Sequence, residues 1–558
     1  MRKEEFTHFF LIPILIGAIG GLAAILFRHI VSLFSWLHTS LDFLNNNYFY
    51  LITMPIIFYI SNLLISKFLI DQSNVTIDNV AKRIALMHGR FSHVRGFLVL
   101  LLSSLSIGFG APVGREGPIA KLGGIMSELF SKAIHAQRVN MPIYLSAGVS
   151  SAIAATFNAP IAGIIFGLEI IIGKINSYIV IPLIIACTTA TVVSDHFIGD
   201  FTAFYVPKIE YSDSYFIYIP FLAIFFALLS LLMLTMLKRL NKVRVSYGKN
   251  WKFVAAAIGF VVGVIIVLVP EVKGVGYDAV SQIFGKGYPS HIAFEIFLAK
   301  IFVVALSVGA GIFGGLMSPS IFIGAFAGYW AGTLLPDASI DPYAFALVGS
   351  AAILAGVSKA PLRATVIVTE LTHSYQLLPP MLMAAAITGY ILSKFEPGSY
   401  FKRCLIQKGI DLENNLVDNF FKTFKIEDFT RDIQPLNPST QIKRVRKLFK
   451  KYKTRYLPVV DQNGKLIGVV SLRDVRKTYL TNEHQKSVEE IMSKKPFSIT
   501  QERKKEQIFK AFSTLDANNI PYTKEDGTYL GMISLDKILS EISFLEKQYE
   551  IDDKPKLL

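Results

Sequence analysis

Two glycine-rich stretches of the sequence each end where an apolar, helix-like run begins. They are residues 108–118 (GFGAPVGREGP) and 309–319 (GAGIFGGLMSP). A helix that starts there presents unpaired backbone N–H groups and the positive end of its dipole, which bind an anion without the full charge that would trap it. These residues therefore favour reversible binding of a small anion. The alternative is that glycine and proline only permit close helix packing.

Glu116 lies within the first stretch, flanked by Arg115 and Gly117. A carboxylate in a setting that favours anions can occupy the anion's own place, from which chloride or protonation displaces it. Glu116 is therefore a candidate gate. The alternative is that Glu116 forms an ion pair with the adjacent Arg115.

Both stretches are part of an internal repeat with a constant offset of 201 residues. The matched positions run without a gap over more than sixty residues and are Ser106/Ser307, Gly108/Gly309, Gly110/Gly311, Gly114/Gly315, Pro118/Pro319, Gly123/Gly324, Gly148/Gly349, Ala159/Ala360, Pro160/Pro361 and Glu169/Glu370. Chance would rarely align so many glycines and prolines, so the body consists of two related halves, about 1–205 and 206–400. Inverted topology is the common arrangement for such repeats.

The elements that must position these residues are apolar segments. They lie at roughly 9–36, 49–70, 93–108, 119–135, 141–156, 161–185, 215–237, 252–269, 292–310, 319–335, 342–356 and 376–394. Several are shorter than the roughly 20 residues needed to cross a bilayer, and glycine or proline interrupts them. Such broken spans place irregular backbone inside the protein, commonly where a transport site is lined.

Composition and charge indicate a membrane protein with a water-exposed tail. The 558 residues are 52% hydrophobic and 17% charged, with a mean hydropathy of +0.47, which excludes an ordinary soluble enzyme. Residues 401–558 hold 30 Lys/Arg and 22 Asp/Glu, against 26 and 19 in the first 400 residues. The net charge of +15 is shared by both parts, so no nucleic-acid partner is expected. Cys187 and Cys404 provide neither a disulfide framework nor a zinc site, and no metal is expected.

The body is expected in a bacterial inner membrane, in contact with lipid, with both termini in the cytoplasm. The first apolar run outlasts a signal-peptide core and lacks a small-residue cleavage pattern, so we expect a retained helix. The basic N-terminus and the charged tail both fit the cytoplasmic side under the positive-inside rule.

Three motifs resemble the CLC family of chloride channels and chloride/proton antiporters. Residues 114–118 (GREGP) match its signature, residues 157–163 (FNAPIAG) match its FNAP(L/I)AG stretch, and residues 314–319 (GGLMSP) resemble its G-x-F-x-P element. The resemblance covers nearly the whole chain. It implies a homodimer with one anion pathway per subunit and Glu116 as the external gating glutamate.

The same resemblance implies which residues bind the anion. Leu316 and Met317 fall at the anion-facing amide positions, with Arg115 and Gly117 beside the gate. The family's GSGIP motif falls on residues 74–78 (NVTID), so Val75 stands where the family serine donates a hydroxyl to the central anion. A shift of one residue would restore a hydroxyl, because Ser73 and Thr76 lie nearby.

At the inner end of the pathway, one alignment also replaces a family residue that has a hydroxyl group by one that has none. Alignment on Leu405 and Gly409 puts Phe401 in the place of the family's pathway tyrosine, while the other register puts Tyr400 there. If both alignments are right and Val75 and Phe401 occupy these two positions, the central site loses two hydroxyl donors, each worth about 1 kcal/mol. It then binds chloride more weakly.

Ile170 is the third departure. Proton-coupled relatives have two glutamates after FNAP, of which the second accepts the internal proton; here Glu169 is kept and Ile170 follows it. Channel members resemble this sequence in having an aliphatic residue there. The simplest interpretation is a passive channel or a weakly coupled pathway, although water in place of the carboxylate leaves an antiporter open.

The tail beyond about residue 424 changes to short strands and amphipathic helices. Two valine-rich runs, 456–461 and 466–474, flank the pair Asn463-Gly464 and predict a β-hairpin followed by a helix. A weaker second copy spans 520–536. The pattern resembles a pair of CBS domains.

The resemblance places the CBS domains at 430–480 and 487–546, after a body at 1–410 and a linker at 411–429, with a terminal segment at 547–558. In nucleotide-binding pairs a Ser/Thr-x-x-Asp element holds phosphate and ribose, and Ser471 and Asp474 match it. No cofactor is required for transport, but the match implies an adenine nucleotide (ATP, ADP or AMP) as a regulatory ligand. The alternative is a ligand-free pair that acts as a dimer scaffold.

The sequence thus predicts a polytopic α-helical membrane protein with two inverted-repeat halves and broken helices, followed by a cytoplasmic α/β CBS pair. The predicted function is chloride transport through a gated channel or weakly coupled pathway, not an enzymatic reaction. A chloride/proton antiporter and a carrier for another anion stay open as alternatives. An intramembrane hydrolase or a CBS-regulated divalent-cation transporter is disfavoured, because the body lacks a paired nucleophile and base and has few acids.

Overall fold

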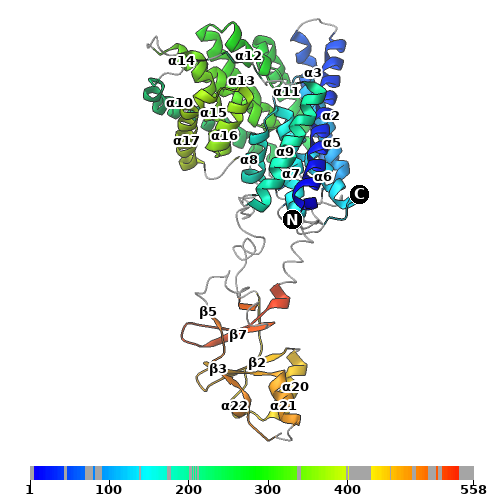
Figure 1. The fold of residues 1–558 in the computed structure, drawn as a ribbon, viewed down its shortest axis with the longest axis vertical. Coiled ribbons are helices and arrows are strands. Elements are labelled where there is room, and N and C mark those ends of the chain that lie inside the picture. The colour runs from blue at the N-terminus through cyan, green and yellow to red at the C-terminus, as the bar shows by residue number, and fades with distance from the viewer. Residues whose placement is uncertain are drawn as a thin grey trace. The chain divides into compact units, whose positions relative to one another are not determined.

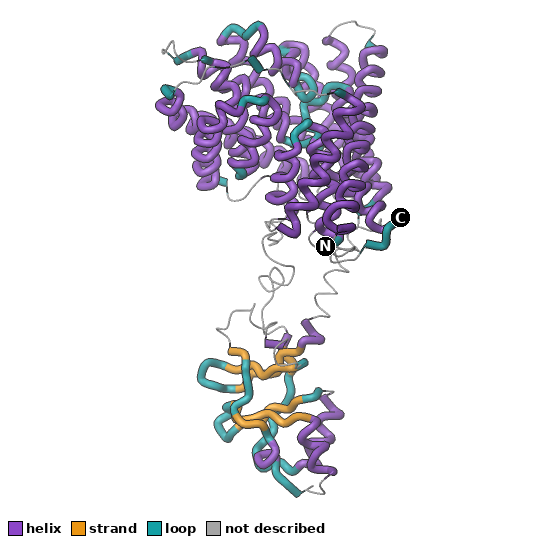
Figure 2. Tube along the Cα trace, in the orientation of Figure 1, coloured by secondary structure: helices purple, strands orange, loops and turns teal. Residues whose placement is uncertain are grey.

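The computed structural model divides into two compact units, whose described residues fall within 6–400 and 429–538. The first unit is helical, and the second combines strands with helices (Figure 1, Figure 2). The structure describes residues 6–42, 47–68, 80–81, 84, 91–136, 140–172, 177–199, 204, 206–207, 209, 213–335, 341–396, 400, 429–452, 454–480, 485–500, 511–512 and 518–538. The predicted linker, apart from Phe429, and the predicted terminal segment lie outside these residues.

The helices of the first unit form two corresponding series. The first series is α2 (Ile12–Leu41), α3 (Tyr50–Phe68), α5 (His93–Gly108), α6 (Glu116–Ala133), α7 (Met141–Phe157), α8 (Pro160–Phe166) and α9 (Ser177–Ile198). The second series is α10 (Tyr215–Tyr247), α11 (Trp251–Leu268), α13 (Ser290–Ala310), α14 (Met317–Thr333), α15 (Pro342–Ser358), α16 (Pro361–Thr372) and α17 (Leu378–Phe395). In five pairs, α3/α11 and α6/α14 through α9/α17, the first residues lie 201 positions apart. The repeat therefore extends beyond the residues that reveal it in the sequence.

The described part of the first unit also contains shorter elements. They are η1 (Thr7–Leu11), η2 (Asn47–Phe49), η4 (Gly167–Ile172), η5 (Gly248–Asn250), η6 (Pro270–Val272), α12 (Tyr277–Gly285) and η7 (Tyr375–Leu377). Of these, η1 and η4 are π-helical turns. Most residues of α6 and nearly all residues of α7, α14 and α15 are buried, so these four helices form the centre of the unit.

The two halves meet through corresponding elements, as halves related by a twofold axis do. Helix α3 packs against α11, and α8 packs against α16. The backbones of Gly114 and Gly315 bridge each other in an antiparallel pair. The halves, blue to cyan and green, lie side by side in Figure 1. The fold is the inverted repeat that the sequence predicts.

Corresponding helices also end with matching backbone conformations. Gly110 after α5 and Gly311 after α13 have φ of 89° and 95°, in the left-handed region that glycine enters without steric cost. Asn158 and Lys359 have φ of 53° and 56° after α7 and α15. Each of these two is followed by Ala-Pro, and the proline opens the next helix because its fixed φ suits a first helical position.

Among the described residues, seven helices are long and apolar enough to cross a membrane. They are Thr7–Leu41, Asn47–Lys67, Ser177–Ile198, Tyr215–Tyr247, Trp251–Leu268, Ser290–Ala310 and Tyr375–Phe395. Other apolar helices are shorter, as expected for broken spans. One expectation needs correction: the apolar run 161–185 is not one segment, since α8 passes into η4 and α9 begins at Ser177. Apolar composition alone cannot separate two successive buried helices.

The described residues of the second unit form two small sheets. One sheet has the strand order β2-β3-β4 and the other β1-β7-β6-β5. The strands are β1 (Thr430–Arg431), β2 (Tyr456–Val460), β3 (Leu466–Ser471), β4 (Ser493–Lys494), β5 (Ile499–Thr500), β6 (Asn519–Thr523) and β7 (Tyr529–Ser534). The named helices in the described residues of this unit are α20 (Ile442–Tyr452), α21 (Leu472–Leu480) and α22 (Val488–Ile491).

The second unit also contains an internal repeat. The hairpin β2/β3 corresponds to β6/β7 at an offset of 63 residues, and both hairpins have a register shift at the same place. Each copy gives its first strand to the sheet of the other, because β1 pairs with β7 while β4 pairs with β3. Reciprocal hydrogen bonds of 3.0 Å, from the amide of Leu466 to Gly527 and from that of Tyr529 to Gly464, join the copies.

Candidate anion-binding site

The first residues of α6 and α14 are held together at the centre of the helical unit. The Gly114 amide donates to the Gly315 carbonyl at 2.9 Å, and the Gly315 amide donates back to the Gly114 carbonyl at 2.7 Å. Helix α6 begins two residues after Gly114 and α14 two residues after Gly315. The two positive helix ends predicted from the sequence therefore lie beside each other.

Glu116 places its carboxylate at the start of the other helix. Its side chain is 0% exposed, and Oε1 accepts a hydrogen bond from the Ser318 amide at 2.8 Å. The Ser318 hydroxyl donates to the same oxygen. Because Ser318 is the second residue of α14, the carboxylate occupies the position that a helix N-terminus offers to an anion.

The second carboxylate oxygen of Glu116 is packed against glycine backbone. Oε2 has no hydrogen-bond donor among the described residues. A Cβ atom added to Gly114 or Gly315 would lie 2.2 or 2.3 Å from Oε2. Glycine is therefore required at both positions for the carboxylate to sit where it does.

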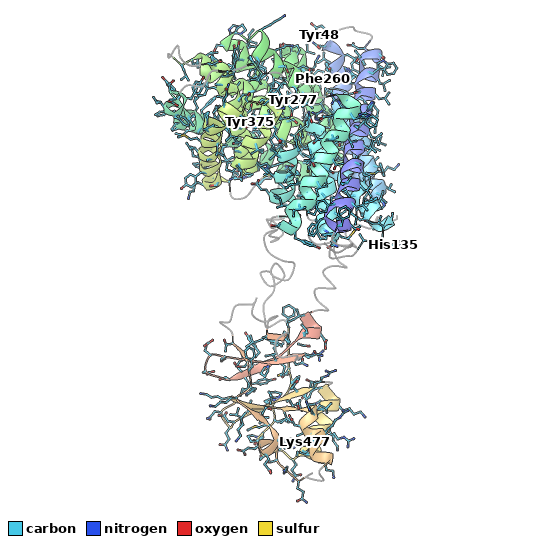
Figure 3. All side chains as sticks on the ribbon, in the orientation of Figure 1. Tyr48, His135, Phe260, Tyr277, Tyr375 and Lys477 are labelled. Carbon is cyan, nitrogen blue, oxygen red and sulfur yellow. The ribbon has the colours of Figure 1, made fainter. Side chains whose placement is uncertain are left out.

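Tyr277 extends the hydrogen bonding behind Ser318. The Tyr277 hydroxyl donates to Ser318 Oγ at 3.0 Å, so Tyr277, Ser318 and Glu116 form one chain of hydrogen bonds. Tyr277 is the first residue of α12 and lies among the helices of the unit in Figure 3. The sequence patterns did not point to Ser318 or Tyr277. The available signal was Ser318 itself, a hydroxyl at the repeat position of Gly117.

Fully buried Lys300 anchors the loop that leads to Tyr277. Its ammonium group donates to the carbonyls of Val272 and Gly274, each at 2.8 Å, and lies 4.3 Å from the centre of the Phe322 ring. The Gly274 amide donates at 2.8 Å to the Gly110 carbonyl in the loop before α6. The loop is thus tied to both halves of the repeat.

Four other predicted anion-binding residues lie around the same helix starts. Arg115 and Leu316 are the N-cap residues of α6 and α14, while Gly117 and Met317 are buried in the first turns of these helices. The amide that binds the Glu116 carboxylate belongs to Ser318 rather than to Leu316 or Met317. The roles of Leu316 and Met317 in binding a transported anion stay predictions.

Arg115 points its guanidinium group over two rings, with Cζ 5.1 Å from the centre of Phe157 and 5.6 Å from that of Tyr277. Its Nε is buried and has no acceptor among the described residues. Arg115 also lines a cavity of about 190 Å³, together with Arg28 of α2. Two guanidinium groups around one cavity give it a positive electrostatic potential, which favours anions over cations.

The predicted inner end of the pathway is only partly described. Val75 and Phe401 lie outside the described residues. Tyr400 interacts electrostatically with Arg244 of α10, and an Arg244 nitrogen lies 2.8 Å from the position of a Cβ added to Gly311. The register that places Tyr400 or Phe401 at the pathway stays a prediction.

Ile170 lies in the π-helical turn η4 and is 2% exposed. Its neighbour Glu169 interacts electrostatically with buried Arg363 of α16. Glu370, the repeat counterpart of Glu169, accepts hydrogen bonds from the amides of Ile161 at 3.0 Å and Ala162 at 2.6 Å. One glutamate of the repeated pair therefore caps the start of α8, and an aliphatic side chain fills the predicted proton position.

In the tail, Ser471 and Asp474 bond to each other. Asp474 Oδ2 accepts from the Ser471 amide at 2.9 Å and from its hydroxyl at 2.6 Å, and the Asp474 amide donates to Ser471 Oγ at 3.1 Å. This reciprocal arrangement caps the start of α21. It explains the Ser-x-x-Asp spacing without a ligand, and the predicted nucleotide role stays a prediction.

Comparison with known proteins extends the resemblance found in the motifs. A model of the family described as voltage gated chloride channel matches residues 57–394, and the CBS domain model matches residues 426–481 and 488–543. A chloride channel protein described as ClcB-like, from Ralstonia nicotianae, is 32% identical over 308 residues, or 53% of this chain and 71% of that protein.

Two further comparisons concern an exchanger and a solved structure. The H⁺/Cl⁻ exchange transporter ClcA of Vibrio cholerae is 27% identical over 292 residues, which are 50% of this chain and 62% of that protein. The crystal structure of a eukaryotic CLC transporter has the same fold, with a TM-score of 0.66, 18% identity, and coverage of 96% of this chain and 98% of that one.

Proposed function

Because the chain belongs to the voltage gated chloride channel family and carries a CBS pair, we propose that Glu116 gates its chloride pathway and that transport is uncoupled or weakly coupled to protons. The observation that carries the proposal is the Glu116 carboxylate bound at the first turn of α14. A carboxylate there excludes a second anion from the same donors, since like charges at one site repel.

Opening requires the carboxylate to leave the Ser318 donors. Chloride that takes over the amide and hydroxyl of Ser318 displaces it directly. A proton on Glu116 acts in the same direction, because a neutral carboxyl accepts weaker hydrogen bonds than a charged one. Chloride flux should therefore rise with chloride concentration and with acidity.

Weak proton coupling is supported by the side chain at the predicted internal proton position. Ile170 is buried and cannot carry a proton. A proton that reaches Glu116 from outside then has no carboxylate relay at this position toward the inside, and anion movement need not carry protons.

The test is chloride efflux from liposomes that contain the purified full-length protein, with simultaneous pH recording. Chloride efflux without uphill proton movement, raised in Glu116→Gln, supports the proposal. Wild-type flux and pH dependence in Glu116→Gln would contradict the proposal that Glu116 is the gate. Uphill proton movement driven by a chloride gradient and abolished in Glu116→Gln would establish the second candidate, a chloride/proton antiporter, which the exchanger relative from Vibrio cholerae favours. Replacing chloride by bromide, nitrate or fluoride in the same assay tests for a carrier of another anion.

We also propose a homodimer in a bacterial inner membrane, with both termini in the cytoplasm. The family resemblance and the exposed apolar side chains on the membrane helices, such as Tyr390 and Val192, support this arrangement. Light scattering of the detergent-solubilised protein measures the subunit number. Labelling of cysteines introduced at the tail in intact cells measures the orientation.

For the tail we propose regulation by an adenine nucleotide. The support is the match of Ser471 and Asp474 to the Ser/Thr-x-x-Asp element of nucleotide-binding CBS pairs, within a chain that carries two CBS domains. Equilibrium binding of radiolabelled ATP, ADP and AMP to the full-length protein, compared with Asp474→Ala, tests the proposal. Equal retention by both proteins, or no retention, contradicts it and leaves the pair as a scaffold.

A further inference from the structure

The Glu116 carboxylate is held by donors that come from the opposite half of the protein. Ser318 contributes both its amide and its hydroxyl to Oε1, and both side chains are 0% exposed. In a water-excluded site, hydrogen bonds to an ionised acceptor are about twice as strong as neutral ones. The two donors of Ser318 therefore stabilise the carboxylate in its present position.

Tyr277 strengthens the hydrogen bond from the Ser318 hydroxyl to Glu116. The Ser318 hydroxyl donates to Glu116 and at the same time accepts from the Tyr277 hydroxyl at 3.0 Å. A hydroxyl that accepts one hydrogen bond becomes a better donor in the next, because the bonds in a chain polarise one another. The chain also fixes the direction in which the freely rotating Ser318 hydroxyl points.

The Tyr277 hydroxyl is itself held in place. Lys300 fixes the carbonyls of Val272 and Gly274 in the loop directly before α12, and Arg115 lies over the Tyr277 ring. The donor end of the chain is thus anchored to α13 through Lys300 and to the start of α6 through Arg115.

We infer that Tyr277 and Ser318 form a hydroxyl latch that holds the Glu116 carboxylate in the closed position and sets the energy needed to open the pathway. In this role Ser318 and Tyr277 are positioning residues for the gate, and they act on the anion through Glu116. The inference rests on the proposed function of Glu116 as the gate.

If the latch exists, the side chains of Ser318 and Tyr277 influence how chloride transport depends on pH. Its donors favour the ionised carboxylate, so removing them makes Glu116 easier to protonate and release. The titratable groups near Glu116 in the described part of the chain are Arg115 at the start of its own helix and Tyr277 of α12, while α14 faces it with neutral Ser318. Both variants below leave Arg115 in place.

The experiment compares chloride efflux from liposomes for the full-length wild type, Ser318→Ala and Tyr277→Phe over a range of pH. Tyr277→Phe should raise flux at neutral pH about fivefold, and Ser318→Ala about tenfold or more, as expected for losing a neutral and a charge-assisted hydrogen bond. In Ser318→Ala, the midpoint of the pH dependence should move up by about one pH unit.

Matched controls make the same two substitutions, serine to alanine and tyrosine to phenylalanine, at positions outside the gate. Ser230→Ala removes a buried hydroxyl that donates to the Phe226 carbonyl within α10, and Tyr288→Phe removes one that donates to Gln282. Both controls should keep the wild-type flux and pH midpoint. Tyr277→Phe, which changes one atom of a ring left in place, keeps the inference testable if Ser318→Ala fails to fold.

The same substitutions in a Glu116→Gln background separate the latch from the gate. The effects of Ser318→Ala and Tyr277→Phe should shrink strongly there, because coupled residues are not additive. If both single variants match the wild type while Glu116→Gln raises flux, the latch is wrong and the gate stands. If their effects persist in full beside Glu116→Gln, the hydroxyls act on another step and the latch is also wrong. If Glu116→Gln itself changes nothing, the proposed gate fails.

Discussion

Gly114 and Gly315 exchange two backbone hydrogen bonds across the centre of the protein, although 201 residues separate them in the chain. They are the same position in the two halves of the repeat. The bridge sets the distance between the first turns of α6 and α14, and so allows a side chain of one helix to bond to the other. It also leaves space for the Glu116 carboxylate only as long as both residues lack a side chain.

Gly315→Ala should displace the gate. The added methyl group would lie 2.3 Å from Glu116 Oε2, and the flexible carboxylate gives way more easily than the backbone. We expect higher chloride flux at neutral pH and a flattened pH dependence, as in Glu116→Gln, measured by efflux from liposomes. Gly285→Ala adds a methyl group that meets nothing within 4 Å and serves as the control. Unchanged gating in Gly315→Ala would contradict the position of the carboxylate.

Lys300→Met should destabilise the helical unit. The substitution removes two hydrogen bonds and leaves the Val272 and Gly274 carbonyls unsatisfied in a buried place. Together these losses cost about 2–4 kcal/mol. A lower melting temperature of the detergent-solubilised protein checks this, with exposed Lys286→Met expected to melt like the wild type. Wild-type stability of Lys300→Met would show that the loop is held by other contacts.

Glu370→Gln tests the cap on α8. An uncharged amide accepts weaker hydrogen bonds from the Ile161 and Ala162 amides, and its NH₂ group cannot accept at all. We expect a loss of about 1–3 kcal/mol in the free energy of unfolding. Thermal unfolding in detergent measures it, and Glu295→Gln, on the exposed face of α13, is the matched control. Equal melting of the two variants would argue against the cap.

Tyr529 makes the tail sensitive to alkaline pH. Burial raises the pKa of its hydroxyl, with the charge of Asp432 acting in the same direction, and the hydroxyl donates to the Ile433 carbonyl at 3.0 Å. The folded state thus favours the protonated form, so this stabilisation is complete below the ordinary tyrosine pKa of about 10 and is lost as pH rises above it.

Tyr529→Phe should therefore be less stable than the wild type at pH 8 by about 1 kcal/mol, the contribution of one hydrogen bond. The difference should shrink between pH 9 and 11, since the hydroxyl that only the wild type has ionises there in the unfolded state, while the folded state keeps it protonated. Hydrogen exchange of the β6/β7 hairpin in the full-length protein, compared between the two proteins at each pH, measures it. A constant difference over this range would rule out ionisation of Tyr529 as the cause.

The sequence by itself determined the two-half body, the broken helices and the position of Glu116 at a helix start. These features follow from local properties of the chain. Apolar runs, glycines and prolines recur at one offset, and each of them affects the backbone only within a few residues of its own position. Local sequence also explains the first CBS hairpin, because a turn-forming Asn-Gly between two valine-rich runs predicts it. It also explains the error at 161–185, where one apolar run contains the end of one helix and the start of another.

Only the tertiary structure decided which groups meet. Glu116 bonds to Ser318 across 202 residues, and Tyr277 joins them from a third helix. In the tail, β1 pairs with β7 of the second copy and β4 with β3 of the first, a pairing that the sequence patterns did not predict. The physical reason is that such contacts depend on how two halves close around an axis. That closure is set by the packing of many buried residues together, and no short sequence motif encodes it.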